Sequence, residues 1–246
     1  MMRVQFLRKK HPRVQRNRQV SSRRMVFETL EWRHLLSATL TPLGALPGYT
    51  TCQPLYINDS GQVAGYCDGS NSEESFLYSG GKMIDLGPTA PVGLDAAGDI
   101  VLNANSYSSY VQSDGTTTAI KPVVGPDGAT RQMYQAYAVS PNGQVVGWGY
   151  SHGNGINEND NYIYSNGVYT TLGNYGNTPQ PLAINDSGQV VGLGNYAPYL
   201  FLYSGGSWTP LPAIPGASTY AVVGINSSGQ VAGDYEDARG GTHVFV

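Results

Sequence analysis

Short stretches in which apolar and polar residues alternate follow one another through most of the chain, and turn-forming residues separate them. After residue 40, no segment repeats its apolar positions at the spacing of a helix. Runs of about 4–8 residues rich in Val, Ile and Tyr, bounded by Gly, Asn and Asp, are typical of strands. The pattern predicts an all-β domain of many short antiparallel strands.

One short motif occurs five times in this domain. Its copies are INDSGQVAG at 57–65, LDAAGDIV at 94–101, VSPNGQVVG at 139–147, INDSGQVVG at 184–192 and INSSGQVAG at 225–233. In each copy an Asn, Asp or Ser opens a type I turn, where its side chain can bond the main chain two residues further on. The glycine that follows, such as Gly61, closes the turn in the left-handed conformation. Each copy is therefore predicted to form a β-hairpin.

Two further strands follow the hairpins. The third strand is predicted at 75–78, 109–112, 161–164, 200–203 and 243–246, and the fourth at 83–86, 118–120, 169–172 and 208–211. Four antiparallel strands in a repeat of about 40 residues are typical of a β-propeller blade. The last repeat lacks its fourth strand, but TPLGALPG at 41–48 parallels TPLPAIPG at 209–216. We expect a five-bladed propeller whose last blade is completed by the N-terminal strand; the alternative is an open array of stacked hairpins.

The repeats resemble the HAF family of extracellular repeats. The resemblance covers residues 39–246 and rests on Gly224-Ile225-Asn226 with Gly229-Gln230-Val231, on Phe76-Leu77-Tyr78 and on Met83-Ile84-Asp85-Leu86-Gly87. The histidine of the family's name is present as His243. The resemblance implies a location outside the cell and a propeller-like fold, and it implies no chemistry.

The charges divide the chain into two parts. Ten of the 14 basic residues lie before residue 34, where only Glu28 and Glu31 oppose them, and the rest of the chain is acidic. We therefore expect a basic segment, 1–38, ahead of a folded acidic domain, 39–246. Such a segment could bind nucleic acid by releasing counterions, but it lacks interleaved aromatic residues and the acidic domain would repel phosphate. No apolar run is long enough for a transmembrane helix.

Residues 27–38 resemble the LEPR-xLL segment of secreted and cell-surface proteins in bacteria with elaborate envelopes. The matching positions are Leu30, Glu31, Arg33, Leu35, Leu36 and Ser37, with Trp32 where the segment usually has proline. The resemblance implies export.

Cys52 and Cys67 are the only cysteines. They lie at equal distances on either side of the turn at 58–61, so the hairpin places them opposite each other or one step diagonal, within reach of a disulfide. In an exported protein we expect the bridge to form. The alternative is a pair of reduced, packed thiols.

The sequence presents no convincing catalytic, cofactor-binding or metal-binding set. Sialidase-like sites need three arginines and glycosidases need two positioned carboxylates, whereas most acidic residues here fall in turns. A Ser–His–Asp arrangement is also missing. The segment 153–161 carries many oxygen donors and could hold calcium, but a solvated loop is the expected structure. Tyrosines such as Tyr56, Tyr78, Tyr107, Tyr110, Tyr162, Tyr164, Tyr196, Tyr199 and Tyr203 are expected to fill gaps between blades, with a carbohydrate- or protein-binding face as the alternative.

Together these features predict an exported, cell-surface repeat protein that acts as a non-catalytic binding or structural module. Its expected partner is a surface glycan or protein, and we expect a monomer. The alternatives are an extracellular carbohydrate-active hydrolase or lyase with its site at the channel mouth, and a nucleic-acid-binding protein that uses the basic segment.

Overall fold

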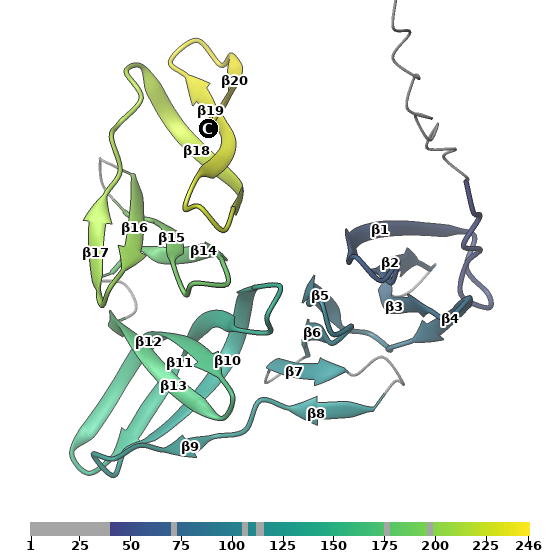
Figure 1. Cartoon of the computed structure of the whole chain (residues 1–246), viewed down its shortest axis with the longest axis horizontal. Helices are drawn as coiled ribbons and strands as arrows, with labels where there is room; N and C mark the ends of the chain where they lie inside the picture. The colour runs from purple at the N-terminus through teal and green to yellow at the C-terminus, as the bar shows by residue number, and fades with distance from the viewer. Residues whose placement is uncertain (1–39, 70–72, 105–107, 112–115, 175–177, 196–198) are drawn as a thin grey trace, which may run out of the picture. The chain divides into compact units, whose positions relative to one another are not determined.

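Each repeat folds into its own antiparallel sheet, so five sheets follow one another along the chain (Figure 1). The computed structural model describes residues 40–69, 73–104, 108–111, 116–174, 178–195 and 199–246. Within them the fold is all-β and propeller-like, as predicted, and no helix occurs that is long and apolar enough to cross a bilayer. The compact part of the chain is Pro42–Val246. The export-like segment 27–38 and the rest of the basic segment lie outside the described residues.

The first two sheets have four strands each, joined in chain order. Sheet 1 consists of β1 (Thr51–Ile57), β2 (Val63–Asp68), β3 (Glu73–Ser79) and β4 (Lys82–Asp85). Sheet 2 consists of β5 (Ala90–Leu94), β6 (Ile100–Asn103), β7 (Ser108–Val111) and β8 (Thr117–Ala119). The predicted third and fourth strands of these repeats are confirmed to within a few residues at their ends.

The third sheet is the largest, because a short extra strand pairs with the edge of its hairpin. It consists of β9 (Val123–Val124), β10 (Thr130–Val139), β11 (Val145–Gly153), β12 (Ile156–Ser165) and β13 (Val168–Asn174). Sheet 4 consists of β14 (Gln180–Ile184), β15 (Val190–Leu193), β16 (Leu200–Ser204) and β17 (Ser207–Pro210). Sheet 5 has only β18 (Ala217–Ile225), β19 (Val231–Asp237) and β20 (Thr242–Phe245).

The five repeated turns have the predicted geometry. In the first, the amide of Gly61 donates to the carbonyl of Asn58 at 3.0 Å, and Asn58 Oδ1 accepts from the amide of Ser60 at 3.1 Å. The marker glycines all have positive φ, from 71° at Gly188 to 94° at Gly98. An L side chain is strained in this region, which explains why glycine occupies the position in every repeat.

A β-bulge recurs in the first strand of every hairpin. The register against the second strand shifts at the same place in each sheet, which leaves Leu55, Val92, Tyr137, Leu182 and Val223 as the extra residues. Opposite four of the bulges lies the last glycine of the motif; a Cβ on Gly147, for instance, would lie 2.1 Å from the carbonyl oxygen of Gln135. At Gly65, Gly147 and Gly233 the main chain of the bulged strand therefore leaves no room for a side chain. Gly192 is instead enclosed by the side chains of Trp208 and Pro179, and the second repeat has Leu102 at this place.

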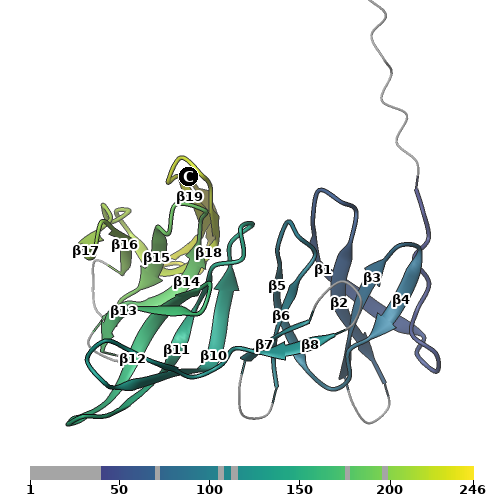
Figure 2. The same ribbon diagram turned by 60° about the horizontal axis from the view of Figure 1, so that its bottom comes forward.

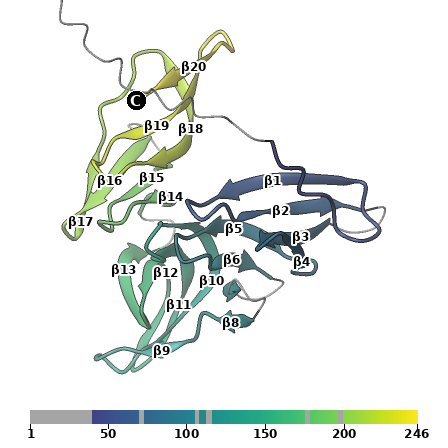
Figure 3. The same cartoon turned by 45° about the vertical axis from the view of Figure 1, so that its right-hand side comes forward.

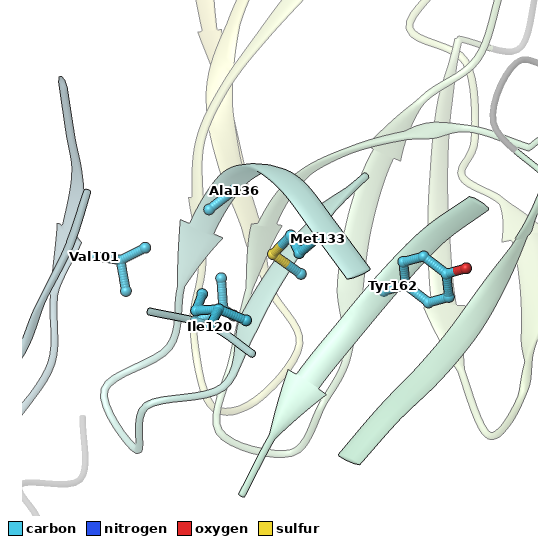
Figure 4. Packing of buried hydrophobic residues seen from close by; sticks show 6 residues of the cluster. Val101, Ile120, Met133, Ala136 and Tyr162 are labelled. Atoms are coloured by element: carbon cyan, nitrogen blue, oxygen red, sulfur yellow. The ribbon is translucent and has the colours of Figure 1, made fainter. Parts of the chain in front are cut away.

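Buried side chains fill the spaces between consecutive sheets. Val101 of β6 packs with Met133 and Ala136 of β10 and with Tyr162 of β12. Ile120 belongs to the same cluster and lies between Val101 and Met133 in Figure 4. Equivalent clusters join sheets 1 and 2, sheets 3 and 4, and sheets 4 and 5. Face-to-face packing of successive sheets is the arrangement expected of propeller blades (Figure 2).

The predicted completion of the last sheet by the N-terminal strand is not present among the described residues. In the structure β20 pairs only with β19, and residues 40–46 form no strand. Instead Leu43 and Leu46 pack on the first sheet in a cluster with Phe76. Leu211, which matches Leu43 in the parallel segment, likewise packs on the sheet that follows it. The sequence parallel therefore reflects how each exit segment covers the next sheet.

Candidate functional site

The outer part of sheet 3 is built from longer strands than those of sheets 1, 2 and 4, and in sheet 5 only β18, with 9 residues, is comparable. Its strands β10, β11 and β12 have 10, 9 and 10 residues, whereas the corresponding strands of sheets 1, 2 and 4 have 4 to 7. The hairpin formed by β11 and β12 is therefore longer than the hairpins formed by the second and third strands of sheets 1, 2 and 4 (Figure 3). Side chains on this extra length are not required to fill a space between sheets.

Aromatic side chains line one face of this extra length. Trp148, Tyr150 and His152 alternate along β11, so they share a face. The rings of Tyr150 and His152 are stacked with centroids 5.9 Å apart, and Tyr134 meets Trp148 edge-on at 5.5 Å. Trp148 and Tyr150 are partly exposed and His152 is exposed. These four residues, with the amides described next, are called the aromatic face.

Side-chain amides flank the rings on both neighbouring strands. In the register of sheet 3, Tyr150 lies opposite Gln132 of β10 and opposite Asn159 of β12. His152 lies opposite Asn157 of β12. The indole nitrogen of Trp148 donates to Gln135 Oε1 at 3.0 Å, and the hydroxyl of Tyr150 donates to Asn157. The aromatic face therefore combines flat apolar rings with donors and acceptors that hold them in place.

An acceptor without a partner lies at the inner end of this face. Among the described residues, Asn161 Oδ1 is the one buried side-chain oxygen or nitrogen that makes no hydrogen bond. Its Nδ2 donates to Thr178 Oγ1 at 3.1 Å, which fixes the orientation of the amide. Asn161 lies opposite Trp148 in the register. Unpaired buried acceptors are rare, and Asn161 is fully buried, so this carbonyl lies beneath the aromatic face and is not part of its surface.

The opposite face of sheet 3 carries a buried polar cluster. Tyr162 donates to Asp160 Oδ2 at 3.0 Å, and the Ser151 hydroxyl is hydrogen-bonded to that of Tyr162. Burial raises the pKa of Tyr162, so its hydroxyl stays protonated at neutral pH. A protonated tyrosine whose hydroxyl donates to Asp160 acts as a hydrogen-bond donor and not as a nucleophile. The cluster therefore stabilises the sheet.

An exposed ion pair lies near this cluster. The guanidinium of Arg131 donates to the carboxylate of Asp127, and this hydrogen bond lowers the pKa of Asp127 to about 2. A groove of about 330 Å³ lies beside Arg131 and is otherwise mostly apolar, with Tyr169 and Val168 in its wall. Burial raises the pKa of Tyr169 to about 12, and its hydroxyl accepts from the amide of Met133. Arg131 is the one charged residue among the described residues that line the groove, and its charge is paired with Asp127.

The predicted disulfide is present. Cys52 and Cys67 lie directly opposite each other in β1 and β2, with an S–S distance of 2.00 Å. Cys67 is fully buried in the cluster under Leu46. The bridge therefore joins the hairpin of sheet 1 at the end away from its turn.

The segment 153–161 is not the solvated loop that its composition suggested. Only Asn154 and Gly155 separate β11, which ends at Gly153, from β12, which begins at Ile156. Asp160 and Asn161 are buried, so two of the predicted oxygen donors point into the fold. Within the described residues no group of three or more His, Cys, Asp or Glu side chains could hold a metal ion.

The described histidines do not complete a catalytic set. His152 belongs to the aromatic face, whereas Ser151 and Asp160 lie on the opposite face of the sheet. His243 pairs with Asp237 at 3.0 Å on an exposed turn. The residues that a Ser–His–Asp mechanism needs are therefore separated.

The tyrosines named from the sequence proved to be mainly packing residues. Tyr162 and Tyr203 are buried, and Tyr56, Tyr78, Tyr164 and Tyr199 are partly buried. The placement of Tyr107 and Tyr196, and the side chain of Tyr110, lie outside the described residues. The sequence analysis missed Tyr134, Trp148 and Tyr150. The alternation Trp-Gly-Tyr-Ser-His at 148–152, in a repeat longer than its neighbours, was the available signal.

No known family profile and no curated protein sequence matches the chain. Among solved structures, it is similar to regucalcin, a calcium-binding protein from Agrobacterium tumefaciens, with a TM-score of 0.41 and 13% identity over 77% of this chain and 71% of that one. It is also similar to a protein from Lactobacillus plantarum, with a TM-score of 0.40 and 15% identity over 80% of this chain and 72% of that one. Likenesses this weak carry no information about ligands.

Proposed function

We propose that the protein is an exported, cell-surface binding module with no catalytic role, and that its aromatic face binds carbohydrate. The observation that carries the proposal is the arrangement of Trp148, Tyr150 and His152 along one strand with side-chain amides on both sides. Sugar rings present an apolar C–H surface and a rim of hydroxyl groups. A row of aromatic rings with adjacent donors and acceptors matches both parts.

Two further features support an extracellular role. A disulfide inside a small domain is favoured by an oxidising compartment. The resemblance of 27–38 to an export segment, and of 39–246 to an extracellular repeat family, points the same way. Neither feature depends on the aromatic face.

Glycan-array binding of the full chain, followed by calorimetry on the strongest ligand, tests the proposal. Replacing Trp148 or Tyr150 by Ala should weaken binding about tenfold or more, because aromatic anchors dominate such contacts. Tyr66→Ala is the matched control, since Tyr66 donates to Gln53 just as Trp148 does to Gln135, but on the shorter sheet 1. Absence of glycan binding, or an equal loss in Tyr66→Ala, would contradict the proposal.

A further inference from the structure

The five repeated turns form a continuous series of contacts, called here the turn ladder, which comprises residues 58–62, 95–99, 140–144, 185–189 and 226–230. At its first step, Asn58 Nδ2 donates to the main-chain carbonyl of Asp95 at 3.0 Å. The side-chain amide group of Gln62 lies in the space that a Cβ on Gly98 would occupy. At its last step, Asn185 Nδ2 donates to the carbonyl of Asn226 at 2.8 Å. Each turn thus presents donors to the next turn.

The middle steps use different residues for the same purpose. The amide of Ala96 donates to the carbonyl of Pro141 at 2.8 Å. The amide of Asn142 donates to Asp186 Oδ1 at 2.8 Å, and Gln144 Nε2 donates to the carbonyl of Asp186. The contact is therefore a property of the turn geometry, and several side chains can complete it.

Among the described residues, the two ends of the ladder are exposed. The residues that open the three inner turns are buried, whereas Asn226 is exposed, and so is Gln230. At the other end Gly61 is exposed, and a Cβ on it would meet no atom within 4 Å. Asn226 Nδ2 donates to Gln230 Oε1 at 2.8 Å, as Asn185 Nδ2 does to Gln189 Oε1, and no hydrogen bond is seen from it to another turn among the described residues. One end therefore has an asparagine amide with a second N–H to donate, and the other end has an open glycine surface like those covered by a glutamine side chain elsewhere in the ladder.

Apolar side chains flank both ends. Ile57 is 73% exposed, whereas Ile184 at the same place in the fourth repeat is 5% exposed. The bulge residue Val223 of the last sheet is 82% exposed, and Leu55 of the first sheet is 44% exposed. Repeat arrays normally end in polar surfaces, because exposed apolar ends associate.

We propose that the last turn of one chain binds the first turn of a second copy, head to tail. Asn226 Nδ2 then donates to the carbonyl of Asn58 in the second copy, and Gln230 lies over Gly61 of that copy. Val223 and Ile57 become buried in the same contact. The internal steps of the ladder are the template, and a second copy is the occupant because the last and first turns of this chain carry the two complementary halves of such a step. Such a contact is heterologous and produces rings or filaments.

Cross-linking of single-cysteine variants tests the contact. Asn142 and Asp186 meet at a middle step of the ladder, and the equivalent positions at the two ends are Ser228 and Asp59. The chain has only two cysteines and both are bridged, so each added cysteine is the one free thiol. A mixture of Asp59→Cys and Ser228→Cys chains, treated with a short bismaleimide, should give a covalent dimer. Arg239→Cys is the matched control, because Arg239 has the same place in a turn of the same kind outside the ladder.

Two outcomes would overturn the proposal. One is a cross-linked yield no greater than in the Asp59→Cys and Arg239→Cys mixture. The other is a double variant, Asp59→Cys with Ser228→Cys, that links only within single chains at every concentration, which would mean that the two ends meet in one molecule.

Sedimentation of Asn226→Asp examines the donor directly. Aspartate keeps the oxygen that caps the turn, as Asp95 does, and removes the amide donor. The dissociation constant for self-association should rise about tenfold, whereas Arg239→Ala should leave it unchanged. Unchanged association in Asn226→Asp would contradict the assignment of the contact.

Discussion

The side-chain amide of Asn185 donates a 2.8 Å hydrogen bond to the main-chain carbonyl of Asn226, which has the same position in the next repeat. The carbonyl oxygen of the same side chain accepts from the amides of Ser187 and Gln189 and so caps its own turn. One side chain therefore shapes a hairpin and attaches it to the following sheet. Asn58 has the same double use, since its amide donates to the carbonyl of Asp95 while its oxygen caps the first turn.

Asn185→Asp separates the two uses of this side chain. Aspartate can still cap the turn, but it cannot donate to Asn226, and Asn185 is only 2% exposed. The free energy of unfolding should fall by about 1–3 kcal/mol, because the carbonyl of Asn226 loses one of its donors and a buried carboxylate then faces that carbonyl. Urea denaturation measures the change. Asn226→Asp, at an exposed turn, should stay within about 0.5 kcal/mol of the wild type at dilute concentration, and equal effects would refute the link between sheets.

Gly147→Ala tests the recurrent bulge. The added methyl would lie 2.1 Å from the carbonyl oxygen of Gln135, so the bulged strand must shift, and stability should fall by about 1–3 kcal/mol or more. Gly224→Ala is the matched control, because nothing lies within 4 Å of a Cβ at Gly224 and its φ is not positive. Thermal melts of the two variants should differ clearly. Similar melting temperatures would show that the close approach is not rigid.

Loss of the disulfide should destabilise the domain. Cys52 and Cys67 are separated by 15 residues, for which loop-closure entropy gives about 3 kcal/mol. The double variant Cys52→Ala/Cys67→Ala should unfold at lower urea concentration than the wild type, and reduction of the wild type should shift its midpoint in the same direction. Mass spectrometry without reductant checks the bridge itself. Free thiols in exported protein would contradict it.

Two exposed carboxylates should titrate at unusually low pH. A hydrogen bond from Arg131 lowers the pKa of Asp127 to about 2, and one from His243 does the same for Asp237. Because the folded pKa lies below the ordinary value, both contributions to stability are present above about pH 4 and disappear as the pH falls through 2. NMR titration should show His243→Asn raising the pKa of Asp237 and leaving that of Asp127 unchanged. A pKa of Asp237 near 4 in the wild type would refute the pairing.

The features that were predicted correctly from the sequence depend on residues close together in the chain. Asn58 and Gly61 specify a turn by themselves, and the position of Cys67 opposite Cys52 follows from counting out from that turn. The packing of Leu43 was not predictable in this way, because one sequence parallel fits both a strand in the last sheet and a cover on the first.

Amino-acid composition gave the wrong prediction for a segment whose polar residues are buried in the fold. The Asn- and Asp-rich segment 153–161 reads as a loop, yet Asp160 is buried because Tyr162 and Ser151 satisfy it. The aromatic face was missed for a related reason. Its rings come together only because β10, β11 and β12 are long, and strand length emerges from pairing between segments.

The indole signals of the tryptophans offer the most direct measurement of carbohydrate binding. The chain has three tryptophans, so NMR resolves Trp148 from Trp208, whose indole nitrogen donates to the carbonyl of Leu172 in the core. In a titration with the strongest glycan ligand, the Trp148 indole signal should shift and saturate while that of Trp208 stays in place. A Trp148 signal that does not move while glycan binds would contradict the proposed site.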